Sequence, residues 1–159
     1  MTLTKTIAAG AVGGLAGGLV LTTFMTIATR AGIIKTPLPV KVERWAEDRA
    51  GVEDGLTGIQ EEVAAQAGHL AFSAGLGALF GAISSTFRLP PLPAGPIYGA
   101  SVYALHLGVL GPAAGITKRP WNEEPETAGR RLMMHVIFGT VTALVADRIA
   151  PRLARPPST

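Results

Sequence analysis

The sequence predicts an all-α integral membrane protein, a four-helix bundle with one short amphipathic helix at the membrane interface. Three observations support this fold class. Long apolar segments recur along the chain, charged residues gather between them, and small residues repeat every four positions in the first segment. Only 16% of the 159 residues are charged, against roughly 25% in soluble domains. We therefore expect a single membrane domain over residues 1–159, with the lipid bilayer as its surroundings.

The first apolar segment, residues 7–29, contains no charged side chain. As a helix it would be ~34 Å long, which is enough to cross the hydrocarbon core of a bilayer. A cleavable signal peptide is disfavoured, because its apolar core would be only about 7–15 residues long. Small residues at four-residue spacing allow a second membrane helix to approach closely. The helix-packing residues expected from this row are Gly10, Gly14 and Gly18.

Three more apolar segments are expected to cross the membrane, at residues 63–87, 97–116 and 132–150. Pro112 lies deep in the third of these and predicts a kink or a helix end near Gly111. Four crossings place both ends of the chain on one side of the membrane. Because Lys and Arg are divided almost evenly between the two sides, the sequence leaves the orientation open.

Two segments between the crossings have patterns of their own. In residues 40–50 the apolar side chains recur at helical spacing around Trp45. This spacing predicts a short amphipathic helix at the membrane interface, although a soluble surface helix fits it equally well. The proline-rich residues 88–96 predict a turn between the second and third crossings.

The three histidines, His69, His106 and His135, each fall in a different predicted crossing. Ionisable residues inside membranes are costly and usually face the interior of the bundle. Counted from the ends of the crossings, the three depths differ by roughly 10 Å at most. Glu62 shares a helix face with His69. Because histidine changes its charge near physiological pH, these four residues are the candidate proton-responsive site.

Two other interpretations of the histidines are open. Three neutral imidazoles suit a transition metal such as Zn, Cu or Fe, so His69, His106 and His135 are also candidate metal ligands. Alternatively, each histidine only hydrogen-bonds a neighbouring carbonyl or hydroxyl group, and the protein has no cofactor. The chain has no cysteine, HExxH motif, P-loop or GxSxG motif, so we expect no catalytic residues and no enzymatic activity.

A series of short motifs runs from about residue 67 to residue 147. Its members are Ala67-Gly68-His69 with Phe72, then His106 and Pro112, Gly115-Ile116-Thr117, Pro120-Trp121-Asn122-Glu123, and His135. In this order they resemble the YagU-like family of small bacterial inner-membrane proteins, whose biochemistry is largely unknown. The resemblance covers about half of the chain. It implies a multi-pass location in the inner (plasma) membrane and an association with survival in acid, with no catalytic activity or cofactor.

Two functions of different classes follow from these observations. The first is a non-enzymatic inner-membrane protein whose intramembrane histidine cluster responds to protons or binds a metal, in acid tolerance. The second is a structural or accessory subunit that assembles through its glycine-rich helix with a second copy or a larger membrane complex. Nucleic-acid binding is not expected, because the net charge is only +3 and no basic stripe is present.

Overall fold

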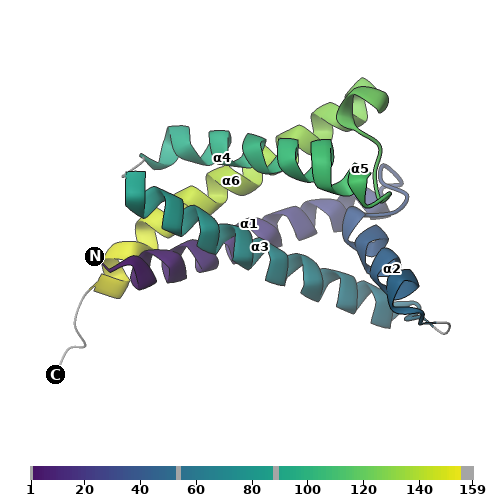
Figure 1. Cartoon of the computed structure of the whole chain (residues 1–159), viewed down its shortest axis with the longest axis horizontal. Helices are drawn as coiled ribbons and strands as arrows, with labels where there is room; N and C mark the ends of the chain where they lie inside the picture. Colours follow the sequence, from purple (N-terminus) through teal and green to yellow (C-terminus); the bar gives the residue numbers. More distant parts are fainter. Residues whose placement is uncertain (1, 53–54, 88–89, 155–159) are drawn as a thin grey trace.

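The computed structural model describes residues 2–52, 55–87 and 90–154, and no β-strand occurs among them (Figure 1). The predicted all-α class is therefore confirmed. The main helices of this described part are α1 (Leu3–Arg30), α2 (Leu38–Ala50), α3 (Ile59–Phe87), α4 (Pro91–Leu105) and α6 (Pro125–Ala154).

Three helices in the described ranges are long and apolar enough to cross a membrane: α1, α3 and residues Pro125–Leu153 of α6. They contain the predicted crossings at 7–29, 63–87 and 132–150, and α2 contains the predicted amphipathic helix at 40–50. The described part of the molecule is thus helical, with three candidate transmembrane helices.

The predicted third crossing at 97–116 differs from the observed helix. α4 begins earlier, at Pro91, continues into a π-helical turn (His106–Leu110), and ends with α5 (Gly111–Ala113). The turn predicted over residues 88–96 is therefore wrong from Pro91 onward, while residues 88–89 lie outside the described part. Pro91 and Pro93 fit the start of a helix because the first four N–H groups there have no intrahelical acceptor.

Pro112 shapes the end of this helix, near the position that the sequence indicated. It has no N–H to donate to the Gly108 carbonyl, and in a regular α-helix its ring would clash with that carbonyl. The turn before it is widened into the π form, in which the Gly111 N–H donates to the His106 carbonyl. The helix ends at Ala113, and Gly115 has a φ of +76°, a backbone conformation that favours glycine.

Glycines bring the helices together in the spatial order α3, α1, α6, α4. A Cβ atom on Gly14 of α1 would lie 2.8 Å from the Cα atom of Gly77 in α3, and one on Gly99 of α4 would lie 2.8 Å from the carbonyl carbon of His135 in α6. Backbone therefore contacts backbone at both interfaces. The α1 glycines that face α3 are Gly10, Gly14 and Gly18, and those that face α6 are Gly13 and Gly17.

The glycine row of α1 is thus used within the chain, and a partner protein would have to use another surface. α3 and α4, in contrast, are bridged by large side chains. The Tyr98 hydroxyl donates to the Leu76 carbonyl at 2.6 Å, and the Tyr98 and Phe80 ring centroids are 5.1 Å apart. In Figure 1, α3 and α4 lie close where the chain passes from one to the other, and they diverge toward the end that carries α2.

Candidate functional site

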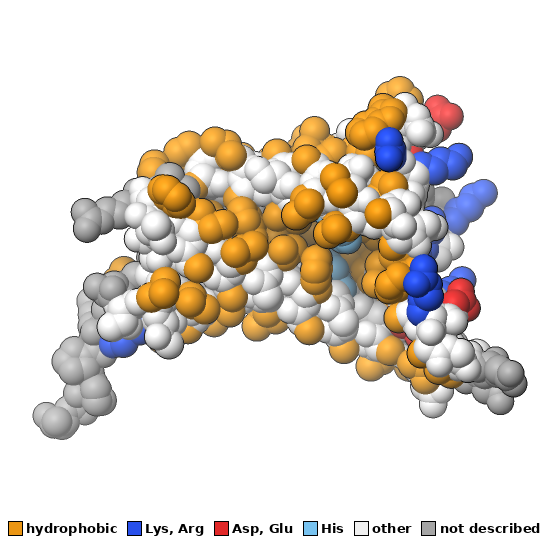
Figure 2. All heavy atoms as spheres, in the orientation of Figure 1, with side chains coloured by type: hydrophobic (Ala, Val, Ile, Leu, Met, Phe, Trp, Pro, Cys, Tyr) orange, Lys and Arg blue, Asp and Glu red, His pale blue; other side chains and the backbone are white. Residues whose placement is uncertain are grey.

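A cavity of about 680 Å³ lies at the α2 end of the molecule, where α3 and α4 diverge. Its wall is assembled from α1 and the segment that follows it, α2, α3, α4, the π-helical turn and α6, so it depends on the complete fold. Figure 2 shows it as a hollow on this face, with histidine side chains inside it and apolar side chains around it. The apolar part of the wall includes Leu21, Met25, Phe72, Leu76 and Phe138.

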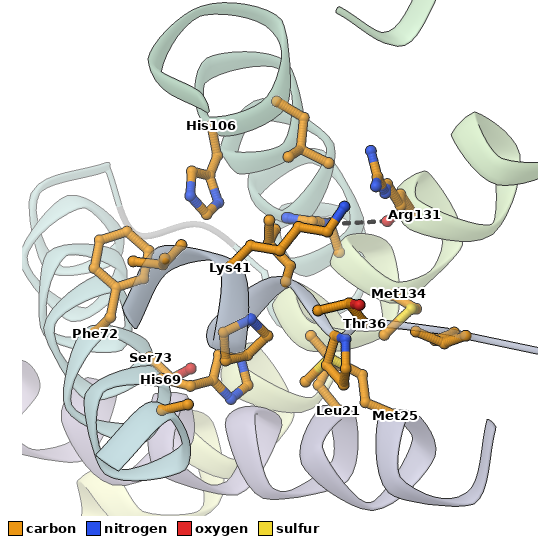
Figure 3. Close-up of a pocket in the computed structure, with 18 of the residues that line it drawn as sticks. Leu21, Met25, Thr36, Lys41, His69, Phe72, Ser73, His106, Arg131 and Met134 are labelled. Carbon is orange, nitrogen blue, oxygen red and sulfur yellow. Dashed lines mark hydrogen bonds between the residues drawn. The ribbon is translucent and has the colours of Figure 1, made fainter. Parts of the chain in front are cut away.

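The side chains of His69, His106 and His135 all line this cavity. The ring centroids of His106 and His135 are 6.2 Å apart, and Figure 3 shows His69 beside Ser73 on α3. The structure therefore brings to one cavity three residues that the sequence places in three separate helices.

Hydrogen bonds orient two of the imidazoles and show which nitrogen of His135 carries the proton. Nδ1 of His135 lies 2.7 Å from the Arg131 carbonyl oxygen; since a carbonyl oxygen only accepts, Nδ1 donates and the neutral ring has its lone pair on Nε2. The Thr22 hydroxyl donates to Oε1 of Gln66 at 2.9 Å. Its oxygen lies 3.1 Å from Nδ1 of His69. In His135, Nε2 is therefore the atom free to take up a proton.

Aromatic rings pack against the imidazoles of His106 and His135, and the π-helical turn positions His106. The ring centroid of His106 is 5.4 Å from that of Phe72, and the Tyr103 ring packs edge-on against His135 at 5.5 Å. His106 is the first residue of the π-helical turn, so the widened turn sets where its side chain enters the cavity. Such turns recur at functional sites.

Within residues 2–52, 55–87 and 90–154, no group of three or more His, Asp or Glu side chains is arranged to hold a metal ion. The interpretation of the histidines as metal ligands gains no support from this arrangement and stays a prediction. Glu62, predicted to act with His69, is exposed and does not line the cavity. It lies two turns from His69, beyond the end of the cavity. Among the described residues, the carboxylate that does line the cavity is Glu43 of α2, which no sequence pattern singled out.

Charged side chains connect α2 to α3 and to Leu56, which precedes α3. The Arg44 guanidinium forms an ion pair with Glu61, and Oε1 of Glu47 accepts the Leu56 N–H at 2.6 Å. Oε2 of Glu43 is buried without a hydrogen-bond partner among the described residues. Burial raises the pKa of Glu43, and the neighbouring carboxylates Glu47 and Glu61 raise it further, against the opposing effect of Arg44.

Four basic residues also line the cavity and form what we call the cationic rim: Lys35, Lys41, Arg130 and Arg131. Arg131 donates to Oε2 of Glu123 at 2.5 Å, so its charge is matched locally. In Figure 3 the Lys41 side chain extends from α2 toward α6, where Arg131 lies. The rim gives the α2 end of the cavity more positive than negative charge.

Comparison with models of protein families, with curated proteins and with solved structures finds no match for this chain. The resemblance to the YagU-like family therefore rests on the sequence motifs, and the function has to be argued from the cavity.

Proposed function

We propose that the chain is a multi-pass protein of the inner membrane, that its cavity responds to protons through His69, His106 and His135, and that it serves acid tolerance without catalysing a reaction. The observation that carries this proposal is that all three imidazoles line one cavity. The YagU-like resemblance supplies the link to acid.

Four membrane crossings suit this architecture best. Besides α1, α3 and α6, the continuous helical run from Pro91 to Ala113 is ~34 Å long at 1.5 Å per residue. It packs along α6 through Gly95 and Gly99, and it exposes large apolar side chains such as Ile97 and Val109. In water such a surface would be unfavourable, whereas lipid chains accommodate it. Figure 2 shows the charged side chains concentrated at the α2 end, where they would meet the headgroups.

Acidification would add charge to a cavity that already contains cations. If His106 and His135 were both protonated, their charges at 6.2 Å would repel by about 3 kcal/mol at an effective dielectric constant of about 20. That is enough to couple their titrations. The charged groups facing them are the cationic rim and Glu43, and Glu43 loses its negative charge in acid. We therefore expect low pH to loosen the packing around the cavity and to admit water.

Hydrogen exchange tests this proposal. In the wild-type protein, amides of α3 near His69 and of α6 near His135 should exchange faster at mildly acidic than at neutral pH, after correction for intrinsic rates. The difference should shrink in His135→Gln. The opposite end of the molecule, around Phe80 and Tyr98, provides an internal control that should not respond to pH.

Met133→Gln is the matched control variant, because it places the same side chain on α6 at an exposed position outside the cavity. It should retain the pH effect. Equal exchange at both pH values in the wild-type protein, or a pH effect that survives in His135→Gln, would contradict a role of the histidines as proton sensors.

A further inference from the structure

The cavity has two chemically different parts. Between α3 and α6 its wall is mostly apolar, with the three imidazoles set into it, and at the α2 end it carries the cationic rim, with Glu43 as the carboxylate lining it among the described residues. A cavity with an apolar interior and a charged mouth matches a ligand that has an apolar chain and a charged head. Its volume of about 680 Å³ is within the ~300–1,000 Å³ typical of small-molecule sites.

Among the described residues, part of the rim's positive charge has no carboxylate partner. Arg131 is paired with Glu123, but Arg130 lies 3.6 Å from Glu126, whose side chain is 90% exposed. No carboxylate in the described ranges forms an ion pair with Lys35 or Lys41. Both lysines are exposed, so an anionic group that reached the mouth of the cavity would find unmatched cations there.

The cavity also opens toward the side of the bundle. Phe72 and Gly68 line it from α3 and are exposed, and the hollow in Figure 2 lies on the long side of the molecule. In the membrane placement proposed above, this opening faces the acyl chains of the bilayer, while the cationic rim lies at the level of the headgroups.

We propose that the cavity binds an anionic phospholipid of the bilayer, with one acyl chain seated between α3 and α4 and the phosphate at Lys41 and Arg130. Basic pockets between membrane helices are suited to anionic headgroups. Lipid chains are as apolar as the cavity wall, so selectivity has to come from the headgroup. A zwitterionic headgroup would add a further cation to a rim that is already positive. The proposal rests on the membrane placement and concerns the same cavity that the three histidines line.

Lipid competition on the full-length chain tests this proposal. The protein in detergent is mixed with equal amounts of phosphatidylglycerol and phosphatidylcholine that have the same acyl chains, and the retained lipid is identified by native mass spectrometry. Phosphatidylglycerol should be retained in preference. Lys41→Gln should weaken its retention about fivefold, the effect of one basic residue near an anionic lipid. Lys118→Gln, which removes a loop cation that does not line the cavity, should leave retention unchanged.

A pair of glycine variants tests where the acyl chain lies. A Cβ atom on Gly68 or on Gly75 would meet no other atom within 4 Å, so both positions on α3 tolerate a side chain. Gly68 lines the cavity and Gly75 does not. Gly68→Leu should therefore abolish retention of phosphatidylglycerol, and Gly75→Leu should preserve it.

Equal retention of the two phospholipids, or wild-type retention in both Lys41→Gln and Gly68→Leu, would overturn the proposal. If the protein retained added oleate in preference to phosphatidylglycerol, the cavity would hold a fatty acid and the proposed phospholipid would not be its occupant. A failure of the membrane placement is distinguishable from these results, because alkaline carbonate would then release the protein from cell membranes.

Discussion

The absence of a side chain at Gly14 determines how closely α1 and α3 approach. Its Cβ atom would lie 2.8 Å from the Cα atom of Gly77, closer than real Cβ contacts allow, and it would also overlap the Ser73 carbonyl. Gly14→Leu should therefore force the two helices apart and lower the thermal unfolding midpoint in detergent. The cost should exceed the ~1–3 kcal/mol typical of overpacked cores, because backbone atoms cannot move aside as side chains do.

Gly75→Leu is the control for this experiment, since it adds the same side chain to α3 where nothing lies within 4 Å. It should unfold at the wild-type temperature or above, because leucine is the better helix former. An unchanged midpoint and elution volume for Gly14→Leu would show that the close contact at Gly14 does not hold the bundle together.

Single residues differ in how much of their role the sequence reveals. The glycine row of α1 is visible as a pattern, and so is the presence of one histidine in each of three apolar segments. The carboxylate at the cavity could not be predicted, because which acid faces the histidines depends on where α2 lies. The structure turns Glu61 toward Arg44 and leaves Glu62 exposed, while Glu43 reaches the cavity from another helix.

At the scale of elements, Glu43 makes the contact between α2 and α3 dependent on pH. Its pKa is raised in the folded protein, first by burial and then by Glu47 and Glu61. The folded state therefore binds the proton of the Glu43 carboxyl group more tightly than the unfolded chain does. The resulting stabilisation of the folded state is fully present below the ordinary pKa of 4.5. It is lost as the pH rises through the raised pKa, because ionised Glu43 then sits beside other carboxylates.

Glu43→Gln should accordingly protect α2 at neutral pH. Hydrogen exchange of the α2 amides should be slower in the variant than in the wild-type protein at neutral pH, and the difference should disappear below pH 4.5. Asp48→Asn, which neutralises an exposed carboxylate on the same helix, should show no such difference. If Glu43→Gln exchanged faster than wild type at neutral pH, the ionised carboxylate would be stabilising α2 and our assignment of its environment would be wrong.

Apolar length and periodicity located α1, α2, α3 and α6, because those patterns are local. The start of α4 was missed, since prolines that end a helix elsewhere are compatible with its first turn. The π-helical turn has no sequence pattern of its own beyond Pro112. Its form follows from the way the chain relieves the clash with the Gly108 carbonyl, and it decides where His106 enters the cavity.

For the whole molecule, the sequence indicated that helices pack through glycine without saying which helices pair. The tight contacts join α3 to α1, α1 to α6 and α6 to α4. α3 and α4, although consecutive, are separated by aromatic side chains and diverge to leave the cavity. The cavity is therefore a consequence of which helix pairs carry glycines at facing positions, and that pairing exists only in the folded chain.

The number of membrane crossings is open to a direct test, because the chain contains no cysteine and single cysteines can be introduced at exposed sites. Thr2, Thr57 and Lys118 are exposed and precede α1, α3 and α6 respectively. If the helical run from Pro91 to Ala113 crosses the membrane, Thr57→Cys and Lys118→Cys lie on the same side and Thr2→Cys lies on the other.

In sealed vesicles or intact cells, a maleimide that cannot cross the membrane should therefore label Thr57→Cys and Lys118→Cys to the same extent. Thr2→Cys should be protected where these two react, and it should react where they are protected. Labelling after detergent solubilisation is the control, and all three variants should then react. If one of Thr57→Cys and Lys118→Cys were labelled and the other protected, the helical run from Pro91 to Ala113 would not cross the bilayer. In that case this run would lie against α6 without spanning the lipid, and the side opening of the cavity would no longer face acyl chains along its full height.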